Sequence, residues 1–326
     1  MTWHAPDVFV VAVSISYPNM DRFMYATSRA GNFRMPPIVP ATAAGLVLGA
    51  LALGAWRTAD LWSWVADACD VLALGVVGVG VVPWQALSPA VRWPAVGLLL
   101  AAAASAVRLP TLRPTGSPAS AAVWALVLVV VVVLVARARR RRPGPAVRRP
   151  LRFPLDGTWY VVQGGGALLN HHARVPEQRA AVDLVRVGPW GTRSRGGGRT
   201  DPAAFLAWDA EVRAPCDGQV VAAVDGLEDR AAGEPGGRSA AGNHVVIDSG
   251  DELVLLAHLR AGSVAVATGE AVRAGRLLGR VGTSGRSTEP HLHLQADRDG
   301  QGLELVFEDV PGRLVRGRRV RAAGRP

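Results

Sequence analysis

The clearest candidates for chemistry in this chain of 326 residues are two histidines, His291 and His293, in the stretch STEPHLHLQA at 287–296. Side chains at positions i and i+2 of a β-strand point to the same face of the sheet. The two imidazoles could therefore be two metal ligands, or one ligand and one acid/base group. They could equally be polar groups on a solvated strand face. A motif this short does not decide among these, so the elements around it matter.

Most of the other histidines lie in the same half of the chain. Six of the seven follow residue 159, and they are His171, His172, His244, His258, His291 and His293. Asp183 lies among them in the apolar run AAVDLV, where a carboxylate is costly without a partner. A catalytic zinc site uses three protein ligands and keeps one position for water. Each residue alone has an ordinary explanation in a core, turn or loop, but together they favour one shared site.

The segments that carry these residues read as β-strands. From Trp159 onwards, apolar runs of period two, such as QVVAAVDG and NHVVIDSGDELVLLAHL, alternate with glycine-rich turns. We therefore expect a mainly antiparallel, partly barrel-like β domain. His244, next to Asn243 on one of these strands, is read as a structural residue.

The first 136 residues have a different composition, dominated by Ala, Val, Leu, Gly and Trp. A membrane-spanning helix needs ~20 predominantly apolar residues. Four segments are candidates, the third of them short: 35–56, 71–91, 93–107 and 119–136. Tryptophans near their ends suit the membrane–water interface. This pattern predicts a multi-pass α-helical membrane domain at 35–136, with three or four spans in contact with the lipid bilayer. Asp67 and Asp70 would be interfacial residues before the second span.

All basic charge comes from arginine, because the 36 Lys+Arg residues include no lysine. Eight arginines lie in 137–152, which reads as an Arg/Pro-rich linker on the cytoplasmic side of a span or against anionic lipid. The basic tail at 311–326 holds six arginines between Arg313 and Arg325 and is expected to be disordered. These runs lack interleaved aromatic residues, so no nucleic-acid partner is expected. Residues 1–34 stay unassigned.

Two other classes of site are disfavoured. The stretch SVAVATGEAVRAGRLLGRVG resembles half of a biotinyl or lipoyl carrier domain, but such carriers attach their cofactor to a lysine, and this chain has none. Cys69 and Cys216 lie in different halves of the chain without CxxC spacing, which argues against a disulfide or a cysteine metal site.

Three longer stretches point to a family. EVRAPCDGQVVAAVDG, GNHVVIDSGDELVLLAHL and VRAGRLLGRVGTSGRSTEPHLHLQ resemble the M23 zinc metallopeptidases, the lysostaphin and LytM type of peptidoglycan endopeptidase. The resemblance runs from about Trp159 to about Glu308 and implies a peptidase domain at 153–310. The apolar first half lies outside it.

The resemblance also implies roles for single residues. The ligand aspartate of the family falls on Asp183 and the ligand histidine of its HxH motif on His293, while its two non-ligand active-site histidines fall on His258 and His291. The family's usual HxxxD motif is broken, because Arg179 stands four residues before Asp183. With a longer spacer, His172 is the favoured first ligand of Zn²⁺ and His171 the alternate. Gln295 stands where many members have glutamate.

The implied activity is that of a membrane-anchored zinc endopeptidase acting on peptide bonds of peptidoglycan cross-links or stem peptides. In that mechanism His258 or His291 moves the proton or bonds the oxyanion. The alternative is a catalytically silent M23-like module that regulates other wall hydrolases, and the completeness of the ligand set separates the two. Because peptidoglycan lies outside the membrane, the C-terminal domain is expected to be extracytoplasmic, although the arginines after the last span favour the cytoplasm.

Overall fold

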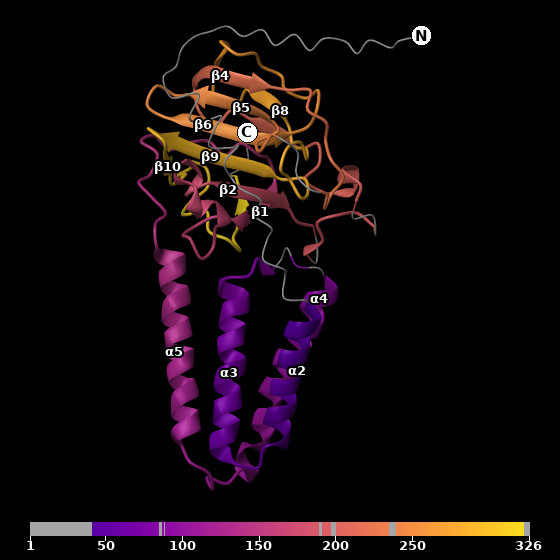
Figure 1. Ribbon diagram of the computed structural model, residues 1–326, viewed down its shortest axis with the longest axis vertical. Helices are drawn as coiled ribbons and strands as arrows, with labels where there is room; N and C mark the ends of the chain where they lie inside the picture. The colour runs from indigo at the N-terminus through magenta and orange to yellow at the C-terminus, as the bar shows by residue number, and fades with distance from the viewer. Residues whose placement is uncertain are drawn as a thin grey trace.

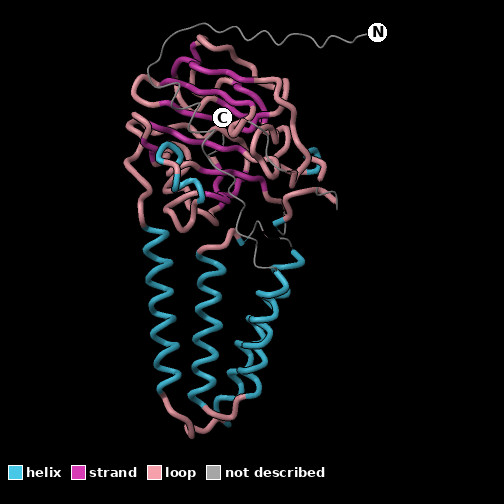
Figure 2. The backbone as a smooth tube through the Cα atoms, in the orientation of Figure 1, coloured by secondary structure: helices cyan, strands magenta, loops and turns pink. Residues whose placement is uncertain are grey.

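The computed structural model describes residues 41–84, 87, 89–188, 191–196, 200–234 and 239–322. The unassigned segment 1–34 and the start of the first predicted span lie outside the described residues. The described chain folds into a bundle of helices that extends from one end of a β domain (Figure 1). Figure 2 shows how the helices and strands separate into these two parts.

The bundle contains four α-helices in its described part. They are α2 (Ala41–Arg57), α3 (Leu61–Gly80), α4 (Pro89–Ala104) and α5 (Ala119–Arg140). A 3-10 helix, η2 (Ser105–Thr111), continues α4. Within the described residues, three helical segments are long and apolar enough to cross a membrane: Leu61–Gly80, Val91–Thr111 and Ala119–Arg140. The prediction of a helical first half is confirmed.

The second predicted span, 71–91, is wrong in its boundaries. Helix α3 begins ten residues earlier because the carboxylate of Asp60 caps it, accepting a bond from Ser63 N at 2.9 Å. The helix ends at Gly80, shortly before Pro83, which cannot continue it. Asp67 and Asp70 therefore lie inside α3 and not ahead of it. The short third candidate is longer than predicted, since α4 and η2 together reach from Pro89 to Thr111.

The β domain is built on one large antiparallel sheet. Its strands are β1 (Thr158–Gln163), β2 (Val182–Arg186), β4 (Gly218–Val224), β5 (Asn243–Asp248), β6 (Leu253–Leu259), β7 (Ala271–Val272), β9 (Leu292–Arg298), β10 (Gln301–Leu303) and β11 (Arg319–Arg321). The order across the sheet is β11-β1-β2-β9-β6-β5-β4-β7, with β10 beside β9. Strands β3 (Glu211–Arg213) and β8 (Leu277–Arg280) form a second, two-stranded sheet. The antiparallel prediction is confirmed, but the partly barrel-like shape is not, because the described strands close no barrel.

The main core of the β domain lies on one face of the large sheet, and a smaller buried cluster that includes Val246 and Leu255 lies on the other face. The largest buried side chains of the main core include Trp159, Phe153 and Ile247, and the ring of Phe153 packs edge-on against Phe307 with centroids 5.4 Å apart. Burying such side chains contributes roughly 1.5–3 kcal/mol each. The predicted linker 137–152 takes part as well: it begins inside α5, and its Leu151 is buried in this core.

The described part of the C-terminal tail, 311–322, includes a strand, so the prediction of a disordered end is wrong for these residues. Strand β11 pairs with β1 through Val320 and Trp159. The side chain of Val320 is buried, whereas Arg319 and Arg321 on either side are exposed. This alternation is the period-two pattern of an edge strand with one apolar face. The strand was not predicted because most of its residues are arginines.

Candidate metal centre

The candidate site lies on one row of residues that crosses the large sheet. Gln163 on β1, Asp183 on β2, His293 on β9 and Ala257 on β6 are successive direct partners in the strand register. Directly paired residues of antiparallel strands share a face. The register therefore places Asp183 between a glutamine and a histidine that are far from it in the sequence.

Asp183 is the hub of the site. Its Oδ1 lies 2.9 Å from Nδ1 of His293, and its Oδ2 lies 2.9 Å from Nε2 of His172. Nε2 of His291 lies 3.8 Å from Oδ1 of the same carboxylate. The carboxyl group is buried, so these histidines supply the partners that the apolar surroundings require.

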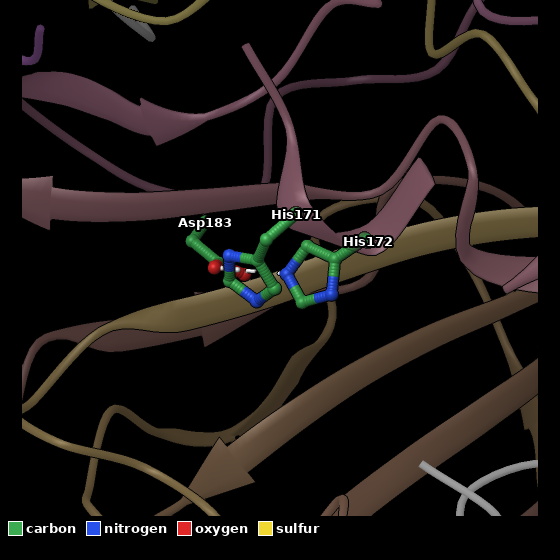
Figure 3. Close-up of side chains that lie close together, drawn as sticks. All are labelled: His171, His172 and Asp183. Atoms are coloured by element: carbon green, nitrogen blue, oxygen red, sulfur yellow. Dashed lines mark hydrogen bonds and ion pairs between the residues drawn. The ribbon is translucent and has the colours of Figure 1, made fainter. Parts of the chain in front are cut away.

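The two adjacent histidines, His171 and His172, form the first turn of the 3-10 helix η3 (His171–Arg174). Figure 3 shows both imidazoles beside the carboxylate of Asp183. Asn170 caps this turn, because its Oδ1 accepts a bond from His172 N at 3.1 Å. Its Nδ2 donates to the carbonyl oxygen of Ala181 at 2.9 Å. The buried amide thus ties the histidine segment to the start of β2.

Gln295 fixes the ring of His293. The glutamine Oε1 lies 2.9 Å from Nε2 of His293 and, as an oxygen acceptor, requires the proton on that nitrogen. Nδ1 donates to Oδ1 of Asp183 at 2.9 Å, and loss of that proton would free its lone pair for a metal. A partner on the second ring nitrogen is the usual support of a histidine that ligates a metal.

His258 and His291 complete the cluster, with ring centroids 4.7 Å apart. Nδ1 of His258 donates to the carbonyl oxygen of Ser284 at 2.9 Å, and Nδ1 of His291 donates to the carbonyl oxygen of Glu289 at 2.8 Å. In both rings Nε2 keeps a lone pair. His258 also has a φ of 62°, a left-handed conformation that costs energy in a residue other than glycine and is concentrated at functional sites.

Burial and the mutual charges set the protonation of the cluster. Burial raises the pKa of Asp183, but His172 and the bond from His293 outweigh it and hold that pKa well below its ordinary value. Burial lowers the pKa of His293, but its bond to Asp183 prevails and raises it. Burial, together with His291 and His293, lowers the pKa of His258 well below its ordinary value. Asp183 is therefore charged and His258 neutral at pH 7.

The donor atoms fit a zinc ion. His171, His172 and Asp183 offer ligand atoms that all lie within 4.8 Å of one another. Nδ1 of His293 faces the same carboxylate at 2.9 Å, although His293 does not fall within that three-residue group. Histidine nitrogen and carboxylate oxygen are ordinary zinc ligands, and the bond from Gln295 is the support expected for one of them. The geometry brings both His171 and His172 into reach, and the choice between them stays a prediction.

A family model matches part of the β domain. Residues 204–305 match the family model described as peptidase family M23. This match, called the M23 segment below, lies in the C-terminal half of the chain. The resemblance seen in the sequence is thereby confirmed, and the M23 segment contains His258, His291, His293 and Gln295. The proposed ligands His171, His172 and Asp183 precede the matched residues.

Solved structures of similar proteins include three peptidases. A peptidase M23 from Pseudomonas aeruginosa is 19% identical, with 54% of this chain and 57% of that chain covered and a TM-score of 0.30. The catalytic domain of lysostaphin from Staphylococcus simulans is 19% identical, with 44% and 81% covered and a TM-score of 0.26. A zinc containing peptidase from Vibrio cholerae is 17% identical, with 50% and 38% covered and a TM-score of 0.26. The chain thus spans little more than half of the first of these, and values this low transfer no residue's role.

Sequence reasoning singled out every histidine of the cluster and Asp183, and the structure brings them together. It missed the residues that hold them. Asn170 precedes the two histidines in the sequence NHH but was given no role, and Gln295 was noted only because many family members have glutamate there. His244 lies outside the cluster, where its Nδ1 donates to the carbonyl oxygen of Gly242 at 2.7 Å. Both cysteines are free.

Proposed function

We propose that this protein is a membrane-anchored zinc endopeptidase that hydrolyses peptide bonds in peptidoglycan cross-links or stem peptides. The observation that supports this most is the convergence of three candidate ligands on one place. His172 and His293 both bond the carboxylate of Asp183, and the rings of His258 and His291 lie in the same cluster. The M23 segment adds a peptidase family to that geometry.

In this proposal His172, Asp183 and His293 hold Zn²⁺, with His171 as the alternate ligand. A bound zinc supplies Lewis acidity, which polarises a carbonyl group and makes a water molecule more acidic. His258 and His291 each present an Nε2 lone pair, so either can accept the proton of the attacking water. The same residue then donates that proton to the leaving amine as the peptide bond breaks, while the other would stabilise the oxyanion only when its Nε2 carries a proton.

The test is release of soluble peptides from purified peptidoglycan by the full-length protein in detergent. Wild-type protein should release new amino termini, and His293→Ala should not. A protein that binds zinc and peptidoglycan but releases nothing would support the alternative of a silent M23-like module that regulates other hydrolases.

The helical bundle supports the membrane part of the proposal. Large apolar side chains on its outer surface face away from the protein, including Leu72 at 58%, Leu100 at 65% and Leu126 at 64% exposure. So many exposed large apolar side chains would be costly in water, and lipid would cover them. We therefore place the bundle in the bilayer and the β domain at its surface.

The side of the membrane follows from the substrate. Taken as spans, the four successive helices put the start of α2 and the β domain on one side of the bilayer. The arginines that follow α5 favour the cytoplasm for that side. We give the substrate more weight and place the β domain outside, because peptidoglycan lies there. Protease treatment of intact, wall-stripped cells should remove a C-terminal epitope, and an epitope that survives until the membrane is breached would place the domain inside.

A further inference from the structure

Arg316 lies where the helical bundle meets the β domain, next to the candidate metal centre. Its Nε donates to the carbonyl oxygen of Val162 at 3.0 Å, and its Nη1 donates to that of Val81, just after the end of α3, at 3.4 Å. Its Nη2 donates to Oε1 of Gln163. One guanidinium group therefore joins the end of a bundle helix to the end of β1.

Gln163 connects Arg316 to the histidine segment, the 3-10 turn that contains His171 and His172. Its Oε1, which accepts from Arg316, also accepts from the backbone N of His171 at 3.2 Å. Gln163 is in addition the direct register partner of Asp183. A single side-chain oxygen thus lies between the arginine and the first candidate ligands.

The backbone around Arg316 makes this arrangement specific. Its own N donates to the carbonyl oxygen of Gly164 at 3.1 Å, and its carbonyl oxygen accepts from Nη1 of Arg139 at 3.2 Å. The same Nη1 of Arg139 donates to the carbonyl oxygen of Gly80, the last residue of α3, at 3.0 Å. The end of β1, the end of α3 and the end of α5 therefore meet at Arg316.

Arg313 offers a comparison in the same segment. Its guanidinium group donates to the backbone carbonyl oxygens of Arg139, Arg140 and Arg141 at the end of α5, and to the side chain of Glu304. It fastens the C-terminal segment to the bundle as Arg316 does. Among the described residues, its side-chain bonds reach neither Gln163 nor the histidine segment. Substitution of Arg313 should therefore weaken only the docking of the bundle, whereas substitution of Arg316 should also remove the bond to Gln163.

We propose that Arg316 is a positioning residue for the ligand segment at His171 and His172, acting through Gln163, and that it couples this segment to the end of α3. The inference rests on the proposed function, since it concerns how that zinc site is held. Outer partners of metal ligands commonly change metal affinity about 10- to 100-fold when they are removed. Arg316 and Gln163 act in series, so their effects are expected to overlap instead of adding.

The test measures zinc affinity of the full-length protein in detergent by competition with a chromophoric chelator. Arg316→Ala and Gln163→Ala should each weaken binding about tenfold, and the double variant should be no weaker than the single ones. Gln163→Glu keeps an oxygen acceptor for both donors and should retain affinity. Arg313→Ala should leave affinity unchanged. The spectrum of bound Co²⁺ should change in the first two variants, which shows altered ligand geometry independently of activity.

Unchanged zinc affinity in Arg316→Ala and Gln163→Ala would overturn the inference while leaving the proposed function intact. An equal loss in Arg313→Ala would also overturn it, because general docking of the bundle would then explain the effect. Wild-type protein without zinc affinity would overturn the proposed function and the inference with it. Gln163→Ala is the decisive variant if Arg316→Ala is poorly folded, since the side chain of Gln163 is only half-buried.

Discussion

Asp183 and His293, separated by 110 positions in the sequence, are direct partners in the register of β2 and β9, with Oδ1 and Nδ1 2.9 Å apart. The backbone ladder of the sheet, and not a loop, sets the distance between these two candidate ligands. Sites built on strands are held more rigidly than sites built on loops. The third candidate ligand, His172, lies in a 3-10 turn that Asn170 caps and ties to the start of β2.

The two adjacent histidines should differ in their effect on zinc. His172→Ala is expected to abolish stoichiometric binding, because Nε2 of His172 reaches the carboxylate of Asp183. His171→Ala should leave most of the zinc in place. Metal content of both purified variants measures this, and a loss confined to His171→Ala would show that the alternate ligand is the true one.

Removing a proton-transfer residue should separate metal binding from turnover. His258→Ala and His291→Ala are expected to keep their zinc and to lose activity by roughly 100-fold or more. Both rings keep Nε2 available for this task, since their Nδ1 atoms are bonded to backbone carbonyl oxygens. Zinc content and peptide release are measured on the same preparations. Zinc loss in His291→Ala equal to that in His293→Ala would make His291 a ligand.

Gln295 should tune the affinity for zinc. Gln295→Leu removes the acceptor from Nε2 of His293 and leaves that buried N–H without a partner, so binding should weaken about 10- to 100-fold. Gln295→Glu retains an acceptor and serves as the matched control, with affinity at least equal to wild type. Chelator competition measures both, and an unaffected Gln295→Leu variant would show that this bond does not support the metal.

Asp297 should make the β domain less stable as the pH rises. Burial raises its pKa from 3.8 to about 6, with Glu177 and Asp299 adding to the shift, and its Oδ2 has no hydrogen-bond partner. The folded state therefore holds this proton more tightly than the unfolded state, and stability falls between about pH 4 and pH 6 and stays low above that window.

Asp297→Asn removes this penalty, so it should raise the free energy of unfolding at pH 7.5 by about 1–3 kcal/mol. The gain should shrink towards pH 4.5, where the native carboxyl is already protonated. Urea unfolding of the chelator-treated protein at both pH values measures it. An equal change at both pH values would assign the effect to packing and not to ionisation.

The elements that could be predicted are those with a clear local pattern of apolar residues. Period-two apolar runs predicted the antiparallel strands, and long apolar runs predicted the helices. The start of α3 was missed because its cap at Asp60 lies in a polar stretch ahead of the most apolar residues. Strand β11 was missed because an arginine-rich strand at a sheet edge keeps only Val320 as its apolar signal.

The candidate site divides in the same way. Residue types and the HxH spacing were enough to predict Asp183, His291 and His293 as residues of the site. The supporting residues were out of reach, since the contact of Gln163 with His171 and Arg316 depends on how the C-terminal segment packs along β1. The position of an amide side chain carries no sequence pattern until the register of the strands is known.

The most direct test of the account is the zinc content of the purified full-length protein, measured by elemental analysis after dialysis and compared with Asp183→Ala and His293→Ala. The account predicts about one zinc per wild-type chain and little zinc in either variant, with the β-sheet signal in circular dichroism preserved. Zinc well below one per chain even after reconstitution, or equal zinc in the wild type and both variants, would contradict it.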